Sequence, residues 1–148
     1  MTDVVDPDTR SRMMSGIRGK NTKPELVLRK ELHKSGYRFR LHDKNLPGKP
    51  DIVLRKYNAV IFINGCFWHR HECHLFKWPK TRPEFWREKI NKNHENDKQA
   101  LKNLATQGWR VCVVWECALK GKSKDLPSVI NKITKWLPGK TKFLEIAG

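Results

Sequence analysis

A nine-residue segment, GCFWHRHEC at residues 65–73, constrains the fold of this chain more than any other feature. It contains two cysteines and two histidines, and His74 follows it directly. A structural zinc ion takes four nitrogen or sulfur ligands, commonly a close pair from a loop and the others from elsewhere in the chain. The fold must therefore bring this segment against a distant ligand, and some of its histidines are left for another role.

The distant ligand is one of two cysteines. Cys112 lies in the middle of the apolar run VCVVW, residues 111–115, where a cysteine is typical of a small buried core residue. Cys117 follows the end of that run, where a loop can approach, so we expect it to join Cys66 and Cys73. One histidine completes the site, and three are candidates: His69, His71 and His74. The alternative is that these cysteines are core residues that bind no metal.

The charge of the chain indicates a polyanionic partner. Its 148 residues include 31 Lys and Arg against 15 Asp and Glu, a formal net charge of +16. The basic residues are spread along the chain, which argues against a solvated charged tail and favours nucleic acid, the commonest polyanion. A membrane surface is disfavoured, because no segment combines a clean apolar helix face with a basic one.

The length favours one compact domain, residues 1–148, in which residues 1–20 form an N-terminal arm with few core-forming side chains. The first residues lack the apolar core of a signal peptide, and VCVVW is too short to span a bilayer. We therefore expect a cytoplasmic protein whose four cysteines stay reduced and can bind metal.

Hydrophobic periodicity and turn residues predict an α/β layer with a mostly covered sheet. TKPE at residues 22–25 has capping-box spacing, which predicts the start of a helix. The predicted elements, in order, are a short helix at 9–17 in the arm, a helix at 22–35, strands at 37–41, 51–54 and 59–63, a helix at 83–107, a strand at 109–115 and a helix at 126–137.

One carboxylate stands where nucleases bind magnesium. Pro50-Asp51 leads a strand, and a second apolar strand follows, which looks like the first half of the PD-(D/E)xK nuclease pattern. The second half is missing, because Ile61-Phe62-Ile63 offers neither an acid nor a lysine. A nuclease built on Asp51 would need another oxygen for its metal, such as the backbone carbonyl of Ile63, and a water activator other than lysine.

A second carboxylate lies on an apolar helix stripe. Five residues spaced three and four apart share one face of the predicted helix: Ile90, His94, Asp97, Leu101 and Leu104. A bare carboxylate facing a core is costly, so Asp97 needs a hydrogen-bond donor. A loop histidine would serve and would make a general base with a fixed tautomer. The alternative is that Asp97 lies at the wet edge of the stripe and pairs with a lysine.

Seven stretches, in order over roughly residues 8–120, carry a resemblance to a known family: DTRSRMM, NTKPELVLRKEL, GYRFRLH, LPGKPDIV, VIFINGCFWHRHEC, TRPEFWREKI and GWRVCVVWECAL. The chain resembles the very short patch repair endonucleases, bacterial nickases that act on T:G mismatches left by 5-methylcytosine deamination. The resemblance implies a restriction-endonuclease-like core, with a mixed β-sheet flanked by helices and a zinc-braced loop. It also implies a Mg²⁺-dependent, strand-specific hydrolase that cuts 5′ of the mismatched thymine.

The resemblance also implies a set of site residues. The zinc ligands would be Cys66, His71, Cys73 and Cys117. His69 would be the general base, paired with Asp97, and Mg²⁺ would be held by Asp51 with the backbone carbonyl of Ile63. Glu25 matches an acidic position near the active site, although its capping-box spacing is a sufficient structural explanation by itself.

The resemblance implies that four apolar residues probe the base stack of the DNA by inserting between base steps. Phe67, Trp68 and Trp86 would intercalate from the major-groove side, and Met14 on the arm from the opposite side; without the resemblance, core packing is the favoured role of the aromatic residues. The chain departs from the family at two positions, with Asn64 where some members have histidine and Asn96 where an arginine is expected.

The implied partners are double-stranded DNA with a T:G mismatch and accessory mismatch-repair proteins. We expect a monomer associated with the bacterial nucleoid. Two other functions fit the same charge and aromatic residues: a zinc-containing DNA-binding module without catalysis, and a restriction-type nuclease that cuts both strands of paired DNA.

Overall fold

The structure is a computed structural model that describes residues 22–66, 69, 71, 73, 76–120 and 124–148. The predicted arm at 1–20, including its short helix, lies outside the described residues. Among the helices within those ranges, none is long and apolar enough to cross a membrane.

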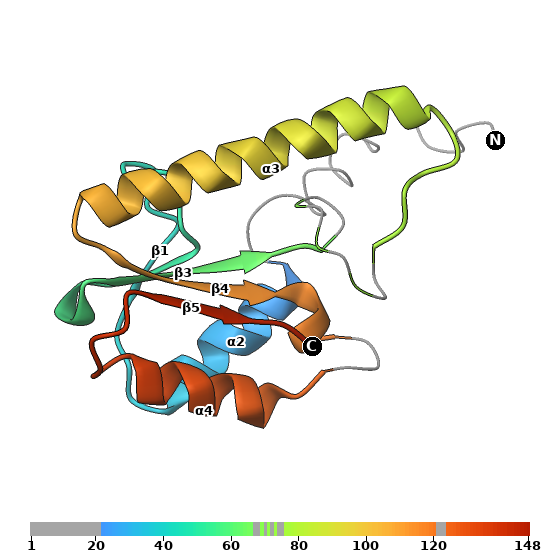
Figure 1. Ribbon diagram of the computed structural model, residues 1–148. Coiled ribbons are helices and arrows are strands. Elements are labelled where there is room, and N and C mark those ends of the chain that lie inside the picture. Colours follow the sequence, from blue (N-terminus) through green and yellow to red (C-terminus); the bar gives the residue numbers. More distant parts are fainter. Residues whose placement is uncertain (1–21, 67–68, 70, 72, 74–75, 121–123) are drawn as a thin grey trace.

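The centre of the fold is a five-stranded mixed sheet (Figure 1). Its strands follow one another in sequence order across the sheet: β1 (Arg40–Leu41), β2 (Ile52–Leu54), β3 (Ala59–Asn64), β4 (Arg110–Trp115) and β5 (Phe143–Ile146). β1, β2 and β3 pair antiparallel, whereas β3–β4 and β4–β5 are parallel. The β3–β4 register sets Asn64 opposite Trp115, so the segments that follow both strands leave the sheet at one edge.

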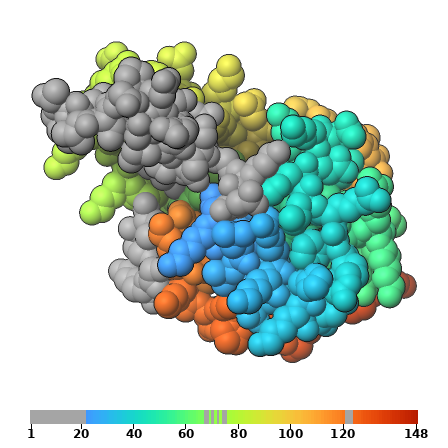
Figure 2. Space-filling model, turned by 180° about the vertical axis from the view of Figure 1, so that it is seen from behind, coloured from blue at the N-terminus to red at the C-terminus, as the bar shows by residue number. Residues whose placement is uncertain are grey.

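Helices cover both faces of this sheet. α3 (Pro83–Thr106) lies along one face, and α2 (Lys23–Lys34) and α4 (Leu126–Trp136) lie on the other (Figure 1). The face with α2 is turned to the viewer in Figure 2, where the yellow-green start of α3 projects at the upper edge. The predicted α/β class, with a mixed sheet flanked by helices, is confirmed.

The core is divided by the sheet into two layers. Cys112 and Val114 of β4 pack with Leu28, Leu32 and other residues on the side of α2 and α4. Val111, Val113 and Trp115 pack with Leu104 on the side of α3. β4 is therefore buried on both faces, which explains why its sequence is a continuous apolar run without alternation.

Three predictions about the elements were incomplete or wrong. The edge strand β5 was not predicted, because its sequence FLEI carries one buried and two exposed side chains and no strong strand pattern. β1 is only two residues long, since Tyr37 and Phe39 pack against the core without joining the sheet. Thr22 is the N-cap of α2, but its side chain makes no cap hydrogen bond, so the capping box is absent.

Candidate active site and metal cluster

Glu25 faces the interior of the protein. Only 1% of its surface is exposed, and its Oε2 accepts hydrogen bonds from Arg29 Nη1 at 2.9 Å and His42 Nε2 at 2.7 Å. Glu25, Leu28 and Leu32 are spaced three and four apart, so they share the buried stripe of α2. This spacing was a missed signal, because an acid on an apolar stripe requires a cationic partner.

Asp51 lies beside this pair at the start of β2. Ligand atoms of Glu25, His42 and Asp51 all lie within 4.8 Å of one another. Asp51 Oδ2 accepts a hydrogen bond of 2.7 Å from the backbone N–H of Ile63 on β3. Sequence reasoning missed His42, whose backbone φ of 51° lies in the left-handed region that most side chains avoid.

Burial raises the pKa of Asp51 from 3.8 to about 6. The N–H of Ile63 partly offsets this effect, the charge of Glu25 adds to it, and the charges of His42 and His69 oppose it. A cation would restore the ionised state, since an adjacent positive charge favours a carboxylate over its acid. Oxygen ligands of this kind are those that Mg²⁺ prefers, and therefore the site suits such a cation.

His69 is held by a carboxylate from the long helix. Its Nδ1 is hydrogen-bonded to Asp97 Oδ2, and the two side chains are 27% and 32% exposed. Asp97 therefore pairs with the loop histidine, so the alternative of a lysine partner was wrong. The next turn of α3 also contacts the loop, because His94 Nδ1 lies 3.4 Å from the main-chain oxygen of His69.

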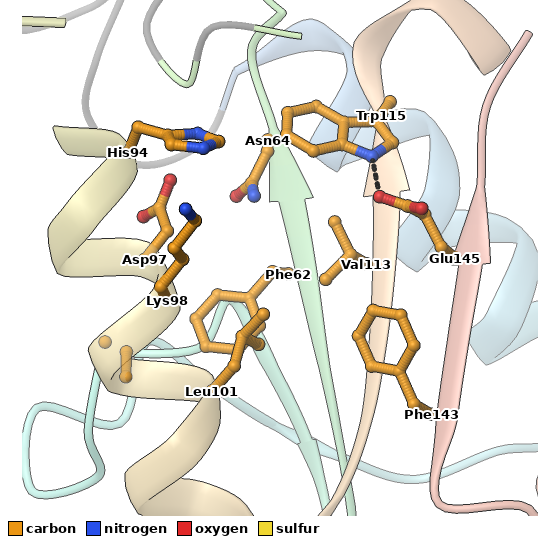
Figure 3. A pocket seen from close by; sticks show the side chains of 12 residues that line it. Phe62, Asn64, His94, Asp97, Lys98, Leu101, Val113, Trp115, Phe143 and Glu145 are labelled. Carbon is orange, nitrogen blue, oxygen red and sulfur yellow. Dashed lines mark hydrogen bonds between the residues drawn. The ribbon is translucent and has the colours of Figure 1, made fainter. Parts of the chain in front are cut away.

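A cavity of about 150 Å³ lies next to this pair, between α3 and the sheet (Figure 3). Asp97 and His94 line it from the helix, and Asn64 lines it from the end of β3. Trp115 forms another wall, and its Nε1 donates a hydrogen bond of 2.8 Å to Glu145. The side chain of Asn64, one of the two departures from the family pattern, thus borders the same space as Asp97.

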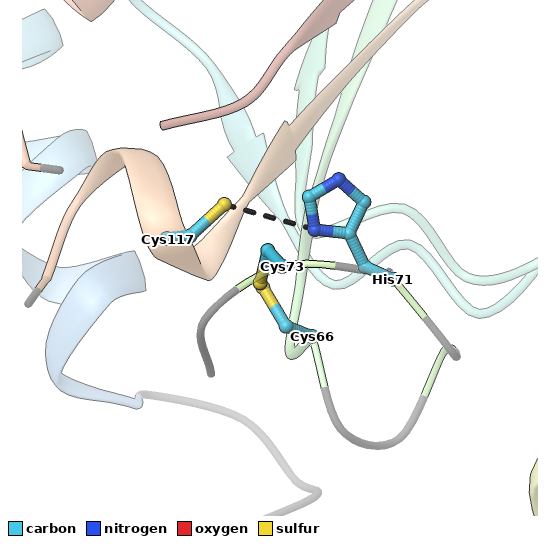
Figure 4. Close-up of side chains that lie close together, drawn as sticks. All are labelled: Cys66, His71, Cys73 and Cys117. Atoms are coloured by element: carbon cyan, nitrogen blue, oxygen red, sulfur yellow. Dashed lines mark hydrogen bonds between the residues drawn. The ribbon is translucent and has the colours of Figure 1, made fainter. Parts of the chain in front are cut away.

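Three cysteines and one histidine form a compact cluster at the edge where β3 and β4 end (Figure 4). The ligand atoms of Cys66, His71, Cys73 and Cys117 all lie within 4.8 Å of one another. Cys117 Sγ is 3.6 Å from His71 Nδ1, close to the roughly 3.5 Å expected between a sulfur and a nitrogen ligand on one tetrahedral zinc ion. Cys112 is not in the cluster and packs in the core, as predicted.

The residues next to Cys117 in sequence and in space contact the cluster and hold its ligands in place. Trp115 stacks on His71, with ring centroids 4.3 Å apart and planes at 9°. Glu116 accepts a hydrogen bond of 3.3 Å from the Cys66 N–H, and the N–H of Gly148 donates to Cys117 Sγ at 3.2 Å. Burial raises the pKa of the Cys66 and Cys117 thiols, so a bound cation must displace their protons.

The predicted aromatic wedges are only partly described. Trp86 lies in the first turn of α3 and is half-buried, with its ring centroid 5.2 Å from that of Phe85. The other three predicted intercalating residues lie outside the described residues: Met14, Phe67 and Trp68.

Comparison with known proteins shows one consistent similarity. The family model of DNA mismatch endonuclease Vsr matches residues 2–75. DNA mismatch endonuclease Vsr of Escherichia coli (strain K12) is 46% identical over 140 residues, which cover 94% of this chain and 90% of that protein. Type II nicking enzyme V.XorIIP of Xanthomonas oryzae pv. oryzae is 49% identical over 119 residues, 80% of this chain and 88% of that enzyme. Type II nicking enzyme V.NmeAIP of Neisseria meningitidis serogroup A is 49% identical over 123 residues, 83% of this chain and 88% of that enzyme.

Proposed function

This chain belongs to the DNA mismatch endonuclease Vsr family, whose members hydrolyse DNA, and from that premise we propose that it nicks one strand 5′ of the thymine in a T:G mispair. The mispair would arise by deamination of 5-methylcytosine. The V.XorIIP and V.NmeAIP relatives are described as nicking enzymes, which supports a cut in one strand over a cut in both. Family membership excludes the alternative of a DNA-binding module without catalysis.

The observation that carries this proposal is the His69–Asp97 pair close to Asp51. The imidazole of His69 is fixed by the carboxylate of Asp97 on one ring nitrogen. Burial raises the pKa of Asp51, and a charge on His69 lowers it, which means that His69 and Asp51 are close enough to interact. A general base and a cation-binding carboxylate are the two parts that hydrolysis of a phosphodiester needs when no lysine is present.

His69 acts as the general base in this proposal. Its Nδ1–H is donated to Asp97, which fixes the tautomer and leaves Nε2 as the proton acceptor. Nε2 takes a proton from the attacking water as the water oxygen bonds to phosphorus, and the P–O bond on the opposite side breaks. Asp97 stabilises the imidazolium that results, in the way that a buried carboxylate supports a catalytic histidine.

Asp51 and the main-chain carbonyl of Ile63 would hold Mg²⁺. When bound, this ion polarises the scissile phosphate and stabilises the leaving oxygen. Asp51 is kept in place by the Ile63 N–H. We assign Glu25 to the same site because its carboxylate lies within 4.8 Å of the carboxylate of Asp51.

We assign the Cys66, His71, Cys73 and Cys117 cluster to structural Zn²⁺. Three thiols and one imidazole form one of the common four-ligand sets of structural zinc. The cluster leaves no position for substrate or water, because all four ligand atoms come from the protein. Its role would be to fix the loop that carries His69.

Mismatch recognition is assigned to aromatic insertion. Trp86 would enter the base stack from the start of α3, together with Phe67 and Trp68 from the loop and Met14 from the opposite side. Stacking of a base on an aromatic ring is worth about 1–3 kcal/mol, so an unstable mispair would accept the ring at lower cost than a paired step.

The decisive experiment compares three duplexes of one sequence, with a T:G mispair, a T:A pair or a C:G pair at the same position, each labelled on either strand. We expect Mg²⁺-dependent cleavage of the thymine strand of the T:G duplex alone, at the phosphate 5′ of the thymine. Varied flanking bases then give the sequence context. Equal cleavage of paired duplexes, or cleavage of both strands, would refute mismatch-directed nicking in favour of a restriction-type enzyme.

A further inference from the structure

Four aromatic rings and two guanidinium groups gather around the start of α3. We call this surface the arginine–aromatic platform, and its residues are Phe76, Trp78, Arg82, Phe85, Trp86 and Arg87. The rings pair edge to face, Phe76 with Trp78 at 5.0 Å and Phe85 with Trp86 at 5.2 Å between centroids. The start of α3 projects at the edge of the molecule in Figure 2.

Two of these rings are not core residues. Trp78 is 41% exposed and Phe85 is 45% exposed, which places both among the most exposed large apolar side chains of the described chain. A single exposed aromatic residue needs no explanation, but neighbouring exposed aromatic residues are typical of an interaction surface. Folding alone therefore does not account for them.

Each exposed ring carries an arginine on its face. The Arg82 guanidinium lies 4.6 Å from the centroid of Phe85, and that of Arg87 lies 5.6 Å from the centroid of Trp78. Within the described ranges, neither guanidinium donates a hydrogen bond or forms an ion pair. A stacked guanidinium keeps its planar fork of N–H donors available at the rim, where it matches the two oxygens of a phosphate.

The charge around the platform selects the partner. Residues 76–89 contain five Lys and Arg against two Glu. An apolar protein partner would bury the rings but leave the guanidinium donors without acceptors, which is costly. A phosphate backbone satisfies the donors and leaves the rings beneath them in place, so duplex DNA fits this surface better.

We infer that Trp78 and Phe85 are positioning residues that hold Arg87 and Arg82 against the backbone phosphates of the bound duplex. This inference rests on the proposed function only in taking duplex DNA as the partner. The role differs from that assigned to Trp86, because a residue that orients an arginine toward phosphate strengthens binding to paired and mismatched DNA equally. A wedge strengthens binding to mismatched DNA only.

A double-mutant cycle on Trp78 and Arg87 tests the inference. This pair is chosen because Phe85 also touches Trp86. Trp78→Ala, Arg87→Ala, the double variant and Trp78→Phe are compared with the wild type by equilibrium binding to a T:G duplex and to its fully paired counterpart across a salt series. Lys132→Ala, which removes one exposed charge from α4 on the other face of the sheet, is the matched control.

Arg87→Ala should lower the slope of log affinity against log salt by about 0.9, the value for one lost phosphate contact, on both duplexes. Trp78→Ala should weaken binding to both duplexes by about two- to fivefold, the factor that corresponds to a cation–π contact at an exposed site. Trp78→Phe should retain most of the affinity, and Lys132→Ala should leave the salt slope unchanged. The double variant should bind no more weakly than Arg87→Ala.

Three results would overturn the inference. Losses that add fully in the double variant would mean that Trp78 and Arg87 do not act together. A loss confined to the T:G duplex would make Trp78 a wedge, and a lowered melting temperature with zinc loss would make it structural. Failure of the wild type to nick T:G duplexes would refute the proposed function separately, because the cycle is measured by binding and gives its result on fully paired DNA as well.

Discussion

Ionised Asp51 should destabilise the fold when no magnesium is bound. Burial raises its pKa from 3.8 to about 6, so the folded protein binds a proton more tightly at this group than the unfolded chain does. One pKa unit corresponds to about 1.4 kcal/mol, and a shift of about two units therefore costs the fold roughly 3 kcal/mol. This cost is fully present above pH 6 and vanishes below pH 3.8, where the group is protonated in both states.

Asp51→Asn removes the charge and keeps an oxygen that can accept the Ile63 N–H. At pH 8 the substitution should raise the free energy of unfolding by about 3 kcal/mol, and at pH 5 by about half as much, because Asp51 is then mostly protonated in the fold. The substitution should also abolish nicking. A residue that destabilises the protein but is needed for activity is expected at a functional site.

The measurement is urea unfolding, followed by tryptophan fluorescence at pH 5 and pH 8, without added magnesium. Asp125→Asn is the matched control, because Asp125 caps α4 through the Ser128 N–H at an exposed position and Asn caps a helix equally well. Added magnesium should stabilise the wild type and not Asp51→Asn, since a ligand stabilises only the state that binds it. A loss of stability in Asp51→Asn at pH 8, or a gain that is the same at both pH values, would refute the reasoning.

Three further predictions concern the proposed zinc ligands, the proposed general base His69 and the proposed wedge Trp86. Cys117→Ser should lose zinc and melt at a lower temperature, whereas Cys112→Ser should retain zinc, as measured by metal analysis and thermal unfolding; the opposite metal contents would reverse the assignment. His69→Ala should keep its zinc and its affinity for the mismatch but lose single-turnover nicking by about 100-fold or more, with a related loss in Asp97→Asn; zinc loss in His69→Ala would instead make it a ligand. Trp86→Ala should reduce the preference for mismatched over paired DNA roughly tenfold with its zinc retained, and an unchanged preference with a lowered melting temperature would indicate core packing.

Sequence patterns within a single strand or helix were sufficient to predict the position of some site residues. Cys117 follows directly after a buried strand, where a loop can approach, and this position predicted its place in the cluster. The helix spacing of Asp97 predicted that it needs a donor partner. The spacing left a loop histidine and a lysine as alternatives, and the loop histidine His69 supplies the donor.

Contacts between segments that are distant in the sequence could not be predicted from such local patterns. The Glu25–His42 pair joins residues 17 apart through a left-handed backbone conformation at His42, and no local pattern encodes it. The assignment of His71 to the cluster came from family resemblance, because the sequence by itself did not decide among His69, His71 and His74. β5 was missed because it pairs on one side only, so its sequence does not need to be apolar on both faces.

The cysteine–histidine cluster has a topological consequence. Cys66 and Cys73 enclose His69, so a cation bound to both closes a chelate ring of eight residues that contains the proposed base. Cys117 would add a second closure across about fifty residues, which contains α3 and β4 and so includes Asp97. Both His69 and Asp97 would thus lie inside rings closed by the same ion. Such chelation would remove entropy from the unfolded chain as a disulfide does, without needing an oxidising environment. The length of the small ring then fixes the direction of His69, so a single residue inserted between Cys66 and His69 should leave the ion bound and turn the imidazole away from Asp97.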